Sequence, residues 1–92
     1  METIETRFQD FHQKNPQVFW DIYSHAQRLR FAGQKKLGMK MIFEVLRYES
    51  ALQTTGDAFK LNNSYAPYYT RLLQFADPEL GALFETRVLT AA

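Results

Sequence analysis

The sequence predicts an all-α fold of about five short helices in a single domain that covers residues 1–92. Apolar side chains recur three and four positions apart, which is the spacing of one helix face. Proline, glycine, asparagine and aspartate interrupt the chain at intervals that suit short helices. A chain of 92 residues has room for one hydrophobic core. A helix-turn-helix-like or winged-helix-like arrangement with minimal β structure is the more specific form of this prediction.

The first helix is predicted over residues 3–13. Ile4, Phe8 and Phe11 are spaced so that they share one face of this helix. Thr3 is a suitable N-cap, because its hydroxyl can accept a hydrogen bond from an amide of the first turn. We therefore expect these three apolar side chains to face the core.

The second helix is predicted from Asn15-Pro16 to about Ala32. Asparagine favours the N-cap position, and proline at the first helical position leaves no amide without a partner. Gly33 can adopt the left-handed conformation that ends many helices. The side chains expected to be buried are those of Phe19, Ile22, Tyr23, Ala26 and Leu29.

A third helix is predicted over residues 39–53, after a connector at 33–38 that two glycines bound. Its inward face is predicted to hold Ile42, Val45 and Leu46, with Met39 and Leu52 extending that face.

Two further helices are predicted in the second half of the chain. Residues 54–57 break the third helix, and a short extended segment could form around residues 59–61. The fourth helix must begin near Asn63 to Ala66, because Pro67 is tolerated only in a first turn. Asp77-Pro78 then caps and starts the last helix. The side chains expected to face inward are those of Tyr69, Leu72, Leu73, Ala76, Leu80, Leu83, Phe84 and Val88.

Charge is unevenly distributed along the chain, although the net charge is only +1. Residues 22–43 contain five cations and no acidic residue, whereas acidic residues outnumber basic ones towards both ends. A basic central block of this kind suits an anionic partner, and it equally suits a solvated loop. Both interpretations stay open at this point.

The residue types that carry most enzyme chemistry are missing or scattered. There is no cysteine, and the four glycines do not form a phosphate-binding loop. The two histidines, His12 and His25, lie on different predicted helices, and neither is expected to be catalytic or to bind a metal. We therefore predict a protein that is not an enzyme and needs no cofactor.

We also expect a cytoplasmic protein that does not enter a membrane. No apolar run approaches the roughly 20 residues that a membrane-spanning helix needs. The first residues lack the apolar core of a signal peptide. The absence of cysteine fits a reducing compartment.

The segment that leads into the fourth helix is rich in side chains that contact nucleic acids. Helix starts attract phosphate, and Asn, Ser and Tyr are common partners of phosphates and base edges. Together with the lysines of the central block, they give a predicted nucleic-acid-binding set. This set comprises Lys35, Lys36, Lys40, Lys60, Asn62, Asn63, Ser64, Tyr68 and Arg71. The alternative is that the asparagines and the serine cap the helix while the tyrosines pack in the core.

Several short motifs occur in an order that resembles a group of small uncharacterised proteins of phages, prophages and actinobacterial mobile elements. They are Arg47-Tyr48-Glu49, Thr54-Thr55-Gly56-Asp57, Phe59-Lys60-Leu61-Asn62-Asn63, Ala66-Pro67-Tyr68-Tyr69, Pro78-Glu79-Leu80 and Phe84-Glu85-Thr86-Arg87. The resemblance extends from the Phe8–Phe11 region to Arg87, and the group often has Trp where this chain has Tyr48. It implies a phage-type gene product that acts in the cytoplasm on DNA or on a host or phage protein.

Two functional hypotheses follow. The first is a small DNA-binding protein that contacts double-stranded DNA through the predicted set. The second is a protein-binding inhibitor or adaptor that acts on a host or phage protein, since the high content of Phe, Tyr and Met suits an interface as well as a core. A homodimer is a variant of the second hypothesis, in which the bound protein is a second copy of this chain.

Overall fold

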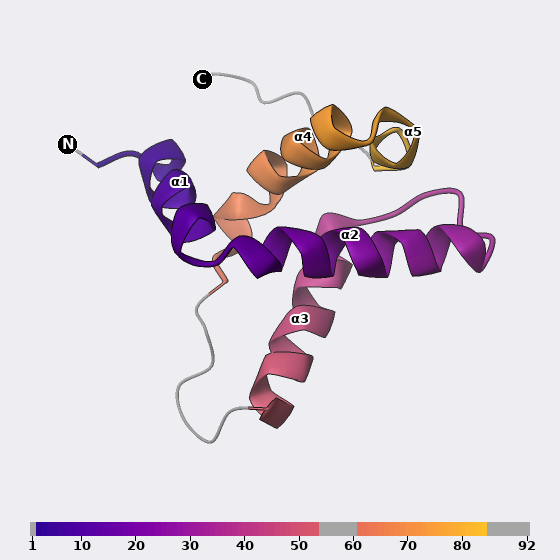
Figure 1. Cartoon of the computed structure of the whole chain (residues 1–92), viewed down its shortest axis with the longest axis horizontal. Coiled ribbons are helices and arrows are strands. Elements are labelled where there is room, and N and C mark those ends of the chain that lie inside the picture. The colour runs from indigo at the N-terminus through magenta and orange to yellow at the C-terminus, as the bar shows by residue number, and fades with distance from the viewer. Residues whose placement is uncertain (1, 54–60, 85–92) are drawn as a thin grey trace.

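The computed structural model describes residues 2–53 and 61–84, and within these ranges the chain is almost entirely helical (Figure 1). The helices are α1 (Ile4–Lys14), α2 (Pro16–Phe31), α3 (Met39–Gln53), the 3₁₀ turn η1 (Asn63–Tyr65), α4 (Ala66–Ala76) and α5 (Pro78–Gly81). The described part of the chain contains no strand, and its β structure is one isolated parallel bridge between Leu37 and Phe84. The all-α prediction is confirmed.

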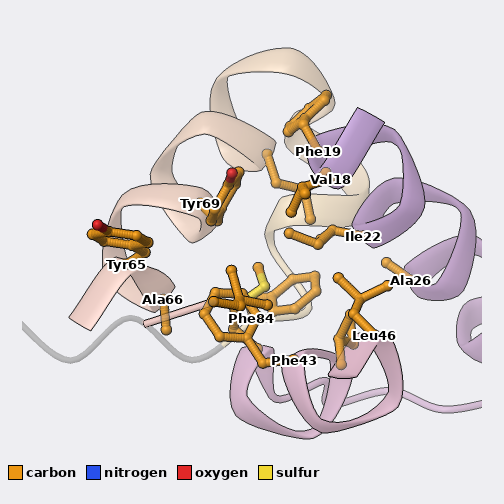
Figure 2. Packing of buried hydrophobic residues seen from close by; sticks show 14 of the residues in the cluster. Val18, Phe19, Ile22, Ala26, Phe43, Leu46, Tyr65, Ala66, Tyr69 and Phe84 are labelled. Atoms are coloured by element: carbon orange, nitrogen blue, oxygen red, sulfur yellow. The ribbon is translucent and has the colours of Figure 1, made fainter. Parts of the chain in front are cut away.

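In Figure 1, α2 crosses the middle of the molecule, α1 and α4 lie above it, and α3 extends below it. The side chains of these helices converge on one core, in which residues from α2, α3, α4 and the segment after α5 face one another (Figure 2). The fully buried large side chains are those of Ile22, Ile42, Phe43, Tyr69, Leu73 and Leu80. Of these, Phe43 is the one whose burial the sequence pattern does not predict.

The predicted limits of α1 hold within one residue, and its predicted N-cap is present. Thr3 Oγ1 accepts a hydrogen bond from the Thr6 amide at 3.1 Å. Phe8 is buried and Phe11 packs partly against the core, as predicted. The prediction for Ile4 is wrong, since its side chain is exposed. Ile4 lies in the first turn of α1, which Figure 1 places at the edge of the molecule.

Asn15 does not cap α2 through its side chain as predicted. Its Nδ2 atom donates instead to the carbonyl oxygen of Phe11 at 3.0 Å, and its backbone amide donates to the same oxygen at 2.9 Å. Asn15 therefore ends α1, because it satisfies a carbonyl that the last turn of a helix leaves free. Pro16 still occupies the first position of α2.

Gly33 ends α2 as predicted. It has a φ of 95°, in the left-handed region that glycine adopts without strain. Its amide donates to the Arg30 carbonyl, and the next amide, from Gln34, donates to the Leu29 carbonyl, both at 3.0 Å. These two bonds form a Schellman motif, which satisfies the carbonyls at the end of α2.

The predicted limits of α3 match the structure, but part of its predicted inward face does not. Ile42, Leu46 and Met39 are buried, whereas Val45 and Leu52 are exposed. The helix turns by about 100° per residue, which places both of these side chains roughly opposite the buried Phe43. The prediction that they face inward is therefore wrong.

The α4 and α5 predictions hold in part. Tyr69, Leu73, Leu80 and Phe84 are buried, and Leu72 and Leu83 are half-buried. The prediction for Ala76 is wrong, since this last residue of α4 is exposed. The last helix is shorter than expected, as α5 ends at Gly81. Val88 and the predicted extended residues Phe59 and Lys60 lie outside the described residues.

Gly81 allows α5 to approach α4 closely. A Cβ atom at this position would lie 2.4 Å from the Cα atom of Gln74, which is backbone and cannot rotate away. We expect Gly81→Ala to lower the free energy of unfolding by about 1–3 kcal/mol, because α4 and α5 must separate. Gly38→Ala is the matched control, since a Cβ atom there meets nothing within 4 Å. Urea denaturation measures both, and equal stability of the two variants would contradict the close packing of α5.

Asp77 caps α5 and also connects it to α2. Its Oδ1 atom accepts from the Leu80 amide at 3.2 Å, and its Oδ2 atom accepts from the Tyr23 hydroxyl at 2.8 Å. These two hydrogen bonds, with a smaller contribution from Arg30, hold the pKa of Asp77 below its ordinary value of 3.8. A carboxylate with a lowered pKa stabilises the fold above its ordinary pKa, and this stabilisation is lost as the pH falls through the folded-state value.

We therefore expect Asp77→Ala to melt at a lower temperature than the parent at pH 7, with a smaller difference below about pH 3. Thermal melts at the two pH values measure this, and Asp77→Asn is the control because it keeps an acceptor for the Leu80 amide. A difference between parent and Asp77→Ala that does not shrink in acid would show that the carboxylate charge is not what stabilises α5.

Candidate interaction surfaces

The lysines of the central block are solvent-exposed and surround the start of α3. Lys35 and Lys36 lie on the connector between α2 and α3, and Lys40 is the second residue of α3. None of the three forms an ion pair with an acidic residue in the described ranges. Arg30, which precedes them at the end of α2, is different because it lies 3.4 Å from Glu79. Three lysines therefore remain available to an anion.

The predicted polar residues before α4 have structural partners. Asn62 Oδ1 accepts from the Ser64 amide at 2.9 Å and so caps η1. Asn63 Oδ1 accepts from the Arg47 guanidinium, which also donates to the Leu61 carbonyl. The Asn62 contact matches the capping interpretation, whereas Asn63 accepts from a side chain of α3 and does not act as a cap. Lys60 lies outside the described residues, and the side chain of Ser64 is exposed.

Arg47 has a structural role that the sequence analysis did not find. Its two hydrogen bonds fasten Leu61 and the start of η1 to α3, and its guanidinium carbon lies 5.9 Å from the centre of the Phe43 ring. The motif Arg47-Tyr48-Glu49 does not indicate this role, because the partners of Arg47 lie 14 and 16 residues later in the chain.

Tyr68 and Arg71, the remaining predicted residues, lie on α4 and face α1. The Tyr68 ring is half-buried and stacks on Phe8 with the ring centres 5.2 Å apart. Arg71 is exposed and lines a shallow hollow of about 360 Å³ between α1 and α4, together with Glu5 and Phe75. The structure therefore groups Lys35, Lys36 and Lys40 at the connector and the start of α3, and it places Tyr68 and Arg71 against another helix.

The titratable side chains in the described part of the chain do not converge on a reaction centre. His25 Nε2 lies 2.8 Å from Glu49 Oε1 and links α2 to α3. The His12 ring packs beside Phe8 and Tyr69. Burial, and to a smaller degree Tyr65, raises the pKa of the Tyr69 hydroxyl, so this group stays protonated. Residues 2–53 and 61–84 contain no cluster of three His, Asp or Glu side chains that could hold a metal ion.

Four exposed apolar side chains form a row along α3, which we call the outer α3 face. Its members are Met41, Val45, Tyr48 and Leu52, with exposed fractions of 47%, 38%, 66% and 70%. Their spacing of four, three and four residues places them in one line along the helix. Two acidic residues of the same helix, Glu44 and Glu49, flank this row. α3 thus has two apolar faces, one that packs into the core and one that meets solvent.

The sequence contains a signal for the outer α3 face, namely the regular spacing of its four members. That signal is ambiguous, because α3 carries apolar residues at enough positions to fit either face against the core. The pattern consequently predicts Val45 and Leu52 on the wrong side of α3, and it does not indicate that Met41 and Tyr48 are exposed.

Comparison with known proteins gives no match: no family model, no curated protein and no solved structure is similar to this chain. The resemblance to phage and mobile-element proteins therefore stays a prediction. Among the described helices, none is both long enough and apolar enough to cross a membrane.

Proposed function

We propose that the protein is a non-enzymatic binding module that recognises another protein through the outer α3 face. The observation that carries this proposal is the exposed row of Met41, Val45, Tyr48 and Leu52. Single exposed apolar side chains are normal on a protein surface, whereas apolar side chains grouped on one face are typical of protein interaction sites. Positions spaced by four, three and four residues are also those through which one helix packs against another.

The core packing of α3 suits this role. The inner side of the helix is fixed in the core by Met39, Ile42, Phe43 and Leu46, and Arg47 connects the helix to Leu61 and the start of η1. A helix held in this way presents its outer side chains without further ordering, which lowers the entropy cost of binding. Other exposed rings, such as Phe31 and Phe75, lie on different helices and do not belong to this row.

The proposal can be tested by affinity capture from nuclease-treated lysate of the source organism. We expect the parent chain to retain a defined partner that Leu52→Asp does not retain, while Phe75→Asp retains it. Phe75 is the matched control because it is 88% exposed but lies on α4. A partner lost with Phe75→Asp and kept with Leu52→Asp would move the binding surface to the hollow between α1 and α4.

Double-stranded DNA binding is a second candidate function, and the exposed lysines of the connector and the start of α3, which pair with no acidic residue in the described ranges, favour it. In this version Lys35, Lys36 and Lys40 contact phosphates, whereas Asn62 and Asn63 serve the fold. A helix-turn-helix-like use of the start of α4 has less support, because both asparagine side chains accept hydrogen bonds within the chain. The phage-type context that the resemblance implies fits either candidate.

If three phosphates are neutralised, the logarithm of the DNA-binding constant should fall with the logarithm of salt concentration at a slope near −3. Replacing Lys35 and Lys36 with glutamine should weaken binding to all sequences and bring that slope near −1, since about one unit is lost for each lysine. Fluorescence anisotropy with a labelled duplex measures this, and Lys14→Gln is the control on α1. No binding at about 50 mM salt, where nonspecific contacts are strong, would remove the DNA candidate.

A further inference from the structure

We infer that the partner of the outer α3 face is an amphipathic helix of another protein, whose apolar row is flanked by lysine or arginine. This inference rests on the proposed function and adds the chemistry of the partner to it. The carboxylates of Glu44 and Glu49 beside the apolar row favour a partner helix with basic flanks over one with acidic flanks and over a second copy of this chain.

Glu44 and Glu49 occupy the positions immediately beside the apolar row. With a turn of about 100° per residue, they lie roughly 70° to either side of the centre of the row. In a pair of packed helices, side chains at such positions face the flanks of the partner helix. The cations of α3 lie further around the helix, and one of them, Arg47, is held by Leu61 and Asn63.

Both carboxylates can reach a partner. Glu44 is exposed and forms no ion pair with a residue in the described part of the chain. Glu49 uses Oε1 to contact His25, and its side chain is 44% exposed. Opposite charges across an interface favour encounter and correct pairing, so lysine or arginine on the partner complements both positions.

A second copy of the chain fits the outer α3 face poorly. In a parallel helix pair, Glu44 of one copy approaches Glu49 of the other, five positions further along. In an antiparallel pair with the rows in register, each glutamate approaches the same glutamate of the other copy. Both orientations bring like charges together and offer no cation to neutralise them, which disfavours self-association.

The test is a selection from a displayed library of helices. Each helix carries apolar residues at the four-three-four spacing, and each flanking position is randomised among Lys, Arg, Glu, Asp, Gln and Ala. The library is selected on the parent chain after depletion on Leu52→Asp. We expect the recovered helices to carry Lys or Arg at the flanking positions.

Charge variants of the protein then test the assignment to Glu44. We expect Glu44→Lys to weaken binding of a recovered basic helix about tenfold, while Glu5→Lys on α1 has little effect despite the same change in net charge. Sedimentation of the parent chain, run alongside, should show a monomer at micromolar concentration.

The possible failures are distinguishable. Recovered helices with acidic or neutral flanks would overturn the inferred partner and leave the proposed function in place. No enrichment over Leu52→Asp would overturn both. A dimer that Leu52→Asp dissociates would identify a second copy as the occupant and would overturn this inference.

Discussion

Replacing Phe43 with alanine is expected to lower the free energy of unfolding by about 3–5 kcal/mol. The Phe43 side chain is completely buried, and its ring meets Tyr69 edge-on with the ring centres 5.9 Å apart. Removing the ring deletes this contact and leaves a cavity between α3 and α4. A small domain has only about 5–15 kcal/mol of stability in total, so most of it could be lost. Urea denaturation followed by circular dichroism measures the change.

Leu52→Ala is the control for this prediction, because it shortens an apolar side chain on the opposite face of the same helix. Leu52 is 70% exposed, and we expect its replacement to change stability by less than about 0.5 kcal/mol. A loss as large as that of Phe43→Ala would mean that the outer α3 face is packed within the chain. In that case the proposed binding surface would not exist.

Replacing Tyr48 with aspartate is expected to weaken binding of a selected basic helix by at least about thirtyfold, which corresponds to about 2 kcal/mol. Tyr48 lies in the middle of the outer α3 face and is 66% exposed. Aromatic side chains at the centre of an interface often dominate its energy, and a buried aspartate without a partner adds a desolvation penalty. Isothermal titration calorimetry measures the affinity, and thermal melts establish that the variant folds like the parent.

Phe75→Asp is the control in this experiment, since it makes the same change at an exposed ring on α4. We expect it to bind the helix like the parent. If Tyr48→Asp binds normally and Phe75→Asp does not, the helix occupies the hollow between α1 and α4, and the assignment to α3 is wrong.

Features of the fold that depend on neighbouring residues could be predicted from the sequence. The Thr3 cap, the left-handed Gly33 and the Asp77-Pro78 start of α5 each require only a few consecutive residues, and all three are present. The predicted side-chain cap of Asn15 on α2 is wrong, although this residue also depends on its neighbours. Two helices meet at this residue, and local sequence does not decide whether its amide serves the helix before it or the one after it.

Features that depend on distant parts of the chain could not be predicted. Phe43 and Leu52 are both apolar and both lie on α3, and only the positions of α2 and α4 decide which of them is buried. The role of Asn63 could not be decided from the sequence either. Its amide suited a nucleic acid equally well until Arg47, sixteen residues earlier in the chain, proved to be its partner.

The most direct test of the account is to map the bound helix on the protein by NMR. A selected basic helix is titrated into the isotopically labelled full chain, and the backbone amide shifts are followed. We expect the largest shifts at Met41, Val45, Tyr48 and Leu52, with further shifts at Glu44 and Glu49. Shifts confined to Lys35, Lys36 and Lys40, or to the α1 and α4 residues around Arg71, would contradict it.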